Sequence, residues 1–71
     1  MNFTQKILHY PIKDFNKAVE LNPQDAKAYG GRGGCYGSIG NYKQAIMDIK
    51  TAAKLGDENA QEFLGRKGIK W

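Results

Sequence analysis

The sequence has few of the residues that cross-link small domains. Its 71 residues include one cysteine, Cys35, and one histidine, His9. An internal disulfide is therefore excluded, and a structural zinc site has too few soft ligands. We expect no metal and no cofactor. A chain of this length forms at most one domain and buries only about 60% of its unfolded surface. Its hydrophobic core is expected to be marginal.

The chain also lacks long apolar runs. No stretch approaches the roughly 20 apolar residues of a membrane span, and the first residues lack the apolar region and cleavage site of a signal peptide. With 41% hydrophobic and 25% charged residues, the composition is too apolar for a disordered chain. We therefore expect a soluble, reduced, cytoplasmic domain that does not insert into membranes.

What the sequence does contain is an internal repeat. Shifting it by 34 residues aligns eight identical pairs, about four times the number expected from ordinary composition. The pairs are Ile12/Ile46, Asp14/Asp48, Ala18/Ala52, Leu21/Leu55, Ala26/Ala60, Gly31/Gly65, Arg32/Arg66 and Gly34/Gly68.

Each period contains helical patterns. Apolar residues from Tyr42 to Ala53 recur on one face of a 3.6-residue helix, Asn41 with Gln44 forms a capping pair, and Gly56 marks the end. The earlier copy, residues 11–21, starts at a proline suited to a first helical turn and ends before Asn22-Pro23.

Two further helices are expected between and after these copies. Asp25 can cap a helix that starts at Ala26 and ends before a turn at Gly40-Asn41, and Asp57 can cap a last helix from about Glu58. No segment alternates long enough to form a strand. The sequence predicts an all-α fold of four helices joined by short turns.

The pattern resembles the tetratricopeptide repeat family. The string DFNKAVELNP at residues 14–23 is typical of that family, and so are the small and large residues of the next copy, which are Tyr29, Gly33, Tyr36, Gly40, Tyr42, Ala45, Ile46, Ile49, Ala52 and Leu55. The resemblance implies antiparallel helix hairpins that stack into a right-handed superhelix. It also implies a non-enzymatic protein that holds a peptide or a partner helix in a concave groove.

The resemblance divides the chain into four parts: an N-terminal extension (1–10), the second helix of a partial repeat (11–25), a complete repeat (26–59), and a capping helix with its tail (60–71). The first repeat lacks its opening helix. We expect this to leave Ile12, Phe15 and Val19 partly uncovered, and we hypothesise that two chains associate through this open end to form a homo-oligomer.

The helix that opens the complete repeat is unusually rich in glycine, and each glycine in a helix costs about 1 kcal/mol relative to alanine. Gly33 sits where the family's paired helices approach closely, whereas core packing does not explain the others. The resemblance places the partner-binding groove at Lys27, Gly30, Gly31, Gly34, Gly37 and Ser38, with Arg66 nearby. Glycines cannot build the carboxylate-binding arrangement of chaperone-docking members. Two interpretations stay open: a smooth channel for another helix, or a weakened groove without a ligand.

The remaining reactive residues form no catalytic unit. His9 is interpreted as a surface or capping residue and Cys35 as a small, half-buried one. Asp14 and Asp48 are expected to be solvent-facing helix charges, while Tyr29, Tyr36 and Tyr42 are expected to pack between helices. The chain is therefore not expected to be an enzyme.

The net charge of +4 raises the question of nucleic acid. The basic residues are scattered over the helices, and the one basic-aromatic cluster, Arg66, Lys67, Lys70 and Trp71, is interpreted as a solvated cap with the Trp folded back. A GGRG string at residues 30–33 resembles RNA-binding loops but lacks their βα context. We predict a protein–protein interaction module, with a purely structural or self-associating unit as the first alternative and a basic RNA-associated module as the second.

Overall fold

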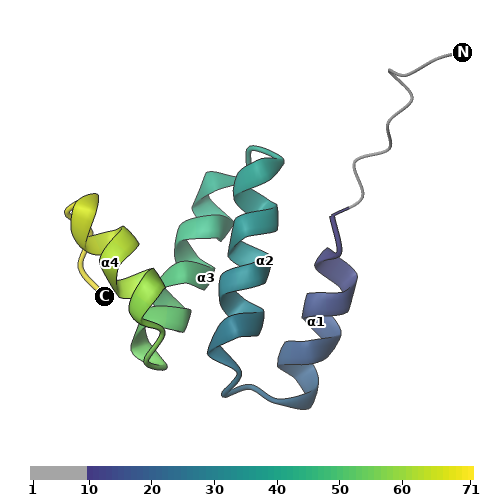
Figure 1. Ribbon diagram of the computed structural model, residues 1–71. Coiled ribbons are helices and arrows are strands. Elements are labelled where there is room, and N and C mark those ends of the chain that lie inside the picture. The colour runs from purple at the N-terminus through teal and green to yellow at the C-terminus, as the bar shows by residue number, and fades with distance from the viewer. Residues whose placement is uncertain (1–9) are drawn as a thin grey trace, which may run out of the picture.

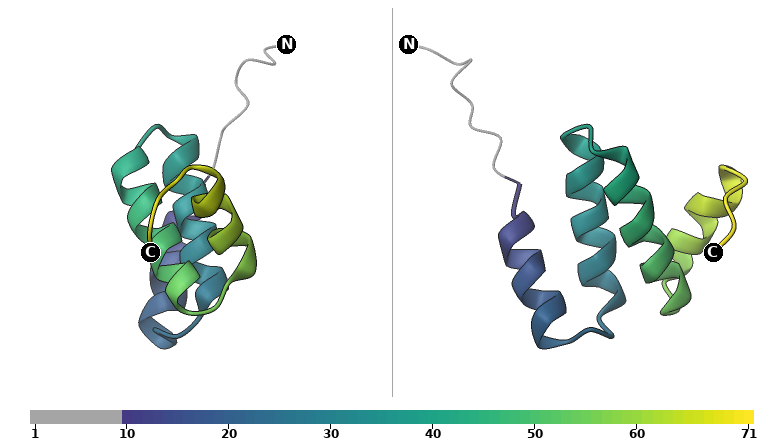
Figure 2. Two further views of the ribbon diagram at one scale, coloured as in Figure 1. Left: turned by 90° about the vertical axis from the view of Figure 1, so that its left-hand side faces the viewer. Right: turned by 180° about the vertical axis from the view of Figure 1, so that it is seen from behind.

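The computed structural model describes residues 10–71. His9 and the rest of the expected N-terminal extension, apart from Tyr10, lie outside the described residues. The elements are four helices, α1 (Ile12–Leu21), α2 (Ala26–Ser38), α3 (Tyr42–Lys54) and α4 (Glu58–Arg66). They follow one another in space as they do along the chain, each packed beside its neighbour (Figure 1, Figure 2). Residues 10–71 contain no strand, which confirms the expected all-α fold.

The helix boundaries follow the capping residues that the sequence indicates. The Asp25 carboxylate accepts the backbone N–H of Ala28 at 3.3 Å, and the Asn41 side chain accepts that of Gln44 at 3.4 Å. Gly40 and Gly56, in the turns after α2 and α3, have φ angles of +87° and +105°. Glycine adopts this left-handed conformation without the steric cost that a Cβ would bring. The turns therefore follow from local chemistry.

The boundaries of the last helix do not follow the 34-residue period of the sequence. The N-caps of α2 and α4, Asp25 and Asp57, are 32 residues apart. Gly34 lies inside α2, whereas its sequence partner Gly68 follows the end of α4 with a φ of +72°. The connection between α3 and α4 is shorter than the connection between α1 and α2. Helix α4 therefore starts earlier in its repeat than α2 does, and it ends at Arg66. The alignment of Gly34 with Gly68 is therefore not a structural equivalence.

The closest helix pair is α2 with α3, and Gly33 lies at their contact. A Cβ on Gly33 would lie 3.0 Å from the carbonyl oxygen of Ala45 and 3.1 Å from both Asp48 Cβ and Ile49 Cγ1. These distances are shorter than ordinary van der Waals contacts. The expectation that Gly33 permits a close approach of the paired helices is confirmed.

Gly31 also has a packing role, which the sequence analysis did not anticipate. A Cβ on this residue would overlap the ring of Phe15 on α1, with 2.6 Å to Cε1 and a shorter distance to Cζ. The statement that core packing explains none of these glycines except Gly33 is therefore wrong for Gly31. The missing side chain makes room for an aromatic ring of the neighbouring helix.

The hydrophobic core lies between α3 and α4 and consists mainly of small side chains. Ala52, Ala53, Ala60 and Leu64 are buried, and partly buried apolar residues pack against them, namely Tyr29, Ile46, Ile49, Phe63 and Ile69. Leu64 is the one large side chain among residues 10–71 that is fully buried. Alanines let the helices approach closely, but each removes little apolar surface from water. The expectation of a marginal core agrees with this composition.

An ion pair joins the middle of α2 to the middle of α3. Arg32 donates from Nε and Nη2 to the two carboxylate oxygens of Asp48, at 2.8 and 2.7 Å, and from Nη1 to the side chain of Asn16 on α1 at 2.9 Å. Asp48 is only 6% exposed. The hydrogen bond to Asp48 raises the pKa of Arg32 above its ordinary value, so the guanidinium stays charged. The expectation that Asp48 faces solvent is wrong.

Two other expectations about the surface differ from the structure. Tyr42 is 69% exposed, whereas Tyr29 and Tyr36 are half-buried and lie near the Arg32 guanidinium. Trp71 is 47% exposed, and Ile69 is the residue of the tail that packs against the core.

Within residues 10–71, none of the helices combines the length and apolar character needed to cross a bilayer.

Candidate partner-binding groove

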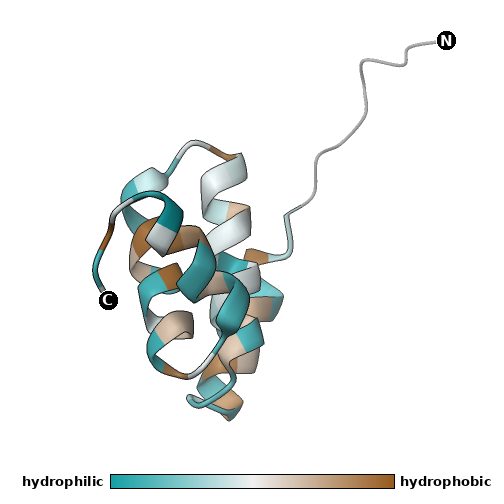
Figure 3. Cartoon of the chain, turned by 60° about the vertical axis from the view of Figure 1, so that its left-hand side comes forward, coloured by the Kyte–Doolittle hydropathy of each residue, from teal (hydrophilic) through white to brown (hydrophobic). Residues whose placement is uncertain are grey.

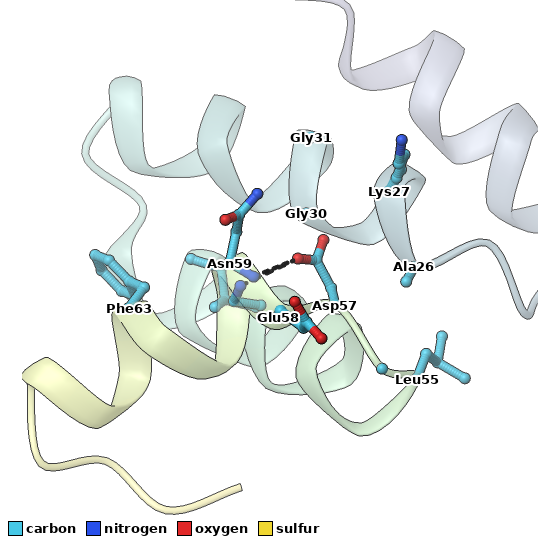
Figure 4. A pocket seen from close by; sticks show the side chains of 12 residues that line it. Ala26, Lys27, Gly30, Gly31, Leu55, Asp57, Glu58, Asn59 and Phe63 are labelled. Atoms are coloured by element: carbon cyan, nitrogen blue, oxygen red, sulfur yellow. Dashed lines mark hydrogen bonds between the residues drawn. The ribbon is translucent and has the colours of Figure 1, made fainter.

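A groove lies between α2 and α4. Its volume is about 730 Å³, and residues of both helices and of the α3–α4 connection line it together with Ile49 of α3. Figure 4 shows α2 along one side and the start of α4 along the other. The lining residues are Ala26, Lys27, Gly30, Gly31, Ile49, Leu55, Gly56, Asp57, Glu58, Asn59, Ala60 and Phe63.

The groove combines apolar side chains with a few polar groups. Ile49, Leu55 and Phe63 supply large apolar surfaces, and the glycines of α2 add only backbone. In Figure 3 the C-terminal half of α2, beyond the part that lines the groove, is drawn pale because glycine is neither strongly hydrophobic nor strongly hydrophilic. An apolar lining with a small number of polar groups is typical of binding sites.

Asp57 has two roles in this arrangement. Its Oδ1 atom accepts the backbone N–H groups of Asn59 and Ala60, at 2.9 and 3.2 Å, and so caps α4. Its Oδ2 atom lies 3.6 Å from the position that a Cβ of Gly30 would occupy. Because Gly30 has no side chain, this second oxygen is reachable from the groove.

Three of the six groove residues expected from the sequence meet here. Lys27, Gly30 and Gly31 line the groove, while Gly34, Gly37 and Ser38 do not. A Cβ on Gly37 would point at Ala45 of α3, 3.8 Å away, and Ser38 donates its hydroxyl to the Gly34 carbonyl at 3.0 Å. The groove therefore lies at the N-terminal half of α2.

The residues contributed by α4 and the turn before it were missed. Asp57, Glu58, Asn59 and Phe63 are among the lining residues, whereas Arg66 pairs with Glu62 at 3.8 Å and is not. The capping signal of Asp57 was visible in the sequence. Its approach to Gly30 was not, because it depends on the angle between α4 and α2.

The expected self-association residues lie on α1. Ile12, Phe15 and Val19 are all half-buried, and α1 contributes no fully buried residue. Phe15 lies against Gly31 of α2. Val19 lines a shallow hollow of about 420 Å³ together with Lys13, Asn16, Lys17 and Glu20. The apolar surface left on α1 is therefore interrupted by charged side chains.

The described residues offer no assembled metal site. Among residues 10–71, no three His, Cys, Asp or Glu side chains lie close enough together to hold an ion. Cys35 is half-buried, as the sequence predicts.

Comparisons with known proteins give several partial relatives. Human protein SGT1 homolog is 38% identical over 58 residues, which are 82% of this chain and 16% of that protein. The Hsp70-Hsp90 organizing protein of Triticum aestivum is 32% identical over 66 residues, 93% of this chain and 11% of that protein. Serine/threonine-protein phosphatase T of Aspergillus oryzae is 42% identical over 50 residues, 70% of this chain and 10% of that protein.

The chain spans about a sixth of the length of these relatives or less. No family model and no solved structure matches it. Protein SGT1 homolog and the Hsp70-Hsp90 organizing protein contain tetratricopeptide repeats, and the four consecutive helices have the arrangement of such repeats. The chain therefore belongs to the tetratricopeptide repeat family.

Proposed function

We propose that the chain is a protein-interaction module that holds a peptide segment or a helix of a partner protein in the groove between α2 and α4. The groove itself carries this proposal, since it is a concavity of about 730 Å³ with an apolar lining and accessible polar groups. A helix or an extended peptide can bury apolar side chains against Ile49, Leu55 and Phe63. The expected role is binding without catalysis.

The relatives support a protein as the partner. The name of the organizing protein states that it organises Hsp70 and Hsp90, so a related helical segment serves in a protein that assembles other proteins. We propose a protein ligand for this chain by the same logic. The match to phosphatase T covers 10% of that enzyme, which agrees with an accessory binding segment.

The test blocks the groove with one side chain. A library of displayed random peptides is selected on the full chain, and the selected peptides are then measured on Gly30→Trp. The matched control is Gly65→Trp, because Gly65 is also a helical glycine but lies outside the groove and has nothing within 4 Å of its Cβ position. We expect affinity to fall at least about tenfold in Gly30→Trp and to be unchanged in the control. Peptides that bind both variants equally would contradict the proposal. Circular dichroism verifies that both variants fold.

A second candidate function is self-association through α1. The supporting observation is that α1 has no fully buried residue, and Leu21 at its end is 74% exposed. We propose that two copies cover this helix in solution, since an uncovered apolar face gains free energy from burial. Sedimentation equilibrium over the micromolar range tests this. A folded monomer at all concentrations would rule out self-association and leave the groove proposal intact.

A further inference from the structure

We infer that the groove between α2 and α4 accepts a partner segment in which a Lys or Arg side chain stands next to an apolar one. This inference rests on the proposed function, because it names the class of ligand for the same groove. Its basis is the charge of the groove wall. Asp57 and Glu58 are both lining residues, and Lys27 is the one cation that lines the groove among residues 10–71.

The two carboxylates are not neutralised by the described part of the chain. The ion pairs within residues 10–71 are Lys17–Glu20, Arg32–Asp48 and Arg66–Glu62, and none involves Asp57 or Glu58. In Figure 4 the Lys27 side chain does not point toward either carboxylate. Within the described residues, a ligand cation can therefore approach both acids without displacing a cation already paired with them.

The geometry around Gly30 gives the cation a path. The Oδ2 atom of Asp57 accepts none of the capping hydrogen bonds, which go to Oδ1. At 3.6 Å from the empty Cβ position of Gly30, Oδ2 faces the groove. A guanidinium or ammonium group forms short, charge-assisted hydrogen bonds with such an oxygen. Phe63 and Leu55, which lie on opposite sides of Asp57 in Figure 4, then each offer an apolar surface to a side chain of the same segment.

The overall charge of the chain helps to identify the cause of a preference for basic ligands. The whole sequence has a net charge of +4, so long-range attraction favours acidic ligands everywhere on the surface. A preference of the groove for a basic ligand opposes that general attraction. It must therefore come from the local carboxylates.

The experiment compares three peptides on the full chain by NMR titration. They are acetylated and amidated eight-residue probes that differ only in a central arginine, glutamine or glutamate flanked by leucines. We expect the arginine peptide to bind about fivefold more tightly than the glutamate peptide at low salt, with the shifts centred on Gly30, Gly31 and Asn59. The difference should shrink at high salt.

The double variant Asp57→Asn/Glu58→Gln removes both charges and keeps a good N-cap residue. We expect it to abolish the preference for arginine, whereas Glu62→Gln, a charge removal on α4 outside the groove, leaves the preference unchanged. A glutamate peptide that binds the groove as tightly as the arginine peptide, or a preference that survives in the double variant, overturns the inference but preserves the proposed function. If no probe shifts the groove amides at millimolar concentration, the proposed function fails as well.

Discussion

Helices α1 and α3 come from equivalent positions of the sequence repeat and have different surroundings. α3 buries Ala45, Asp48, Ala52 and Ala53, whereas α1 buries no residue fully. The reason is the number of neighbours: α3 packs between α2 and α4, while α1 packs mainly against α2 (Figure 1). The same residue types therefore have different energetic roles in the two copies.

The aspartates of the two helices show the difference most clearly. Asp14 and Asp48 are identical in the repeat, but Asp14 is exposed and Asp48 is buried in a two-hydrogen-bond pair with Arg32. Arg32 lies on α2 and bonds to Asn16 on α1 as well as to Asp48 on α3. A repeat in the sequence thus specifies a helix, but the neighbouring helix decides whether a charge within it is structural.

The largest expected effect comes from removing the buried charge. Asp48→Ala leaves Arg32 without its carboxylate and is expected to lower the free energy of unfolding by about 3 kcal/mol, because a half-buried guanidinium then has no counter-charge. The matched change Asp14→Ala should alter it by less than about 0.5 kcal/mol. Urea denaturation followed by circular dichroism measures both. Equal effects of the two substitutions would show that burial does not distinguish the helices.

The alanines of the two helices give the next contrast. Ala52 has no exposed surface, whereas its repeat partner Ala18 is half-buried. Ala52→Leu is expected to lower the free energy of unfolding by about 2 kcal/mol, since the added carbons overpack the core, and Ala18→Leu by less than about 0.5 kcal/mol. Thermal melting curves of the two variants compare them directly. A loss of stability on Ala18→Leu that matched Ala52→Leu would indicate that α1 is packed as tightly as α3.

The glycines of α2 probe each neighbour separately, because Gly33 faces α3 and Gly31 faces Phe15 of α1. Gly33→Ala should cost about 1 to 2 kcal/mol of global stability, since backbone atoms of α3 must move. Gly31→Ala should cost about 1 kcal/mol and act locally, by displacing the weakly held α1. Hydrogen exchange distinguishes them. Loss of protection confined to α1 is expected for Gly31→Ala, and loss throughout the helices would contradict the local effect.

The last of the α2 glycine substitutions is expected to change stability in the opposite direction. Gly34 lies on the same helix but has nothing within 4 Å of its Cβ position. Gly34→Ala is therefore expected to raise the free energy of unfolding by about 1 kcal/mol, the difference in helix propensity. Urea denaturation measures this change, with Gly33→Ala as the control of opposite sign. A destabilised Gly34→Ala variant would show that this glycine has a packing partner.

The sequence by itself determined the local structure of this protein. Period, caps and turn glycines specify where α1 to α4 begin and end, because Asp25, Asn41 and Asp57 bond to backbone groups only two or three residues away. The need for a residue without a Cβ at Gly33 was also visible, through the resemblance to the repeat family. These features depend on interactions close in sequence or on a regular period.

Only the tertiary structure decided the burial of Asp48, the role of Gly31 and the composition of the groove. Arg32 and Asp48 are 16 residues apart, and nothing local indicates that they meet. Phe15 reaches Gly31 because α1 lies against α2, and Asp57 reaches Gly30 because a shortened connection sets the start of α4. Contacts of this kind depend on how the helices are placed relative to one another, and a one-dimensional pattern does not contain that placement.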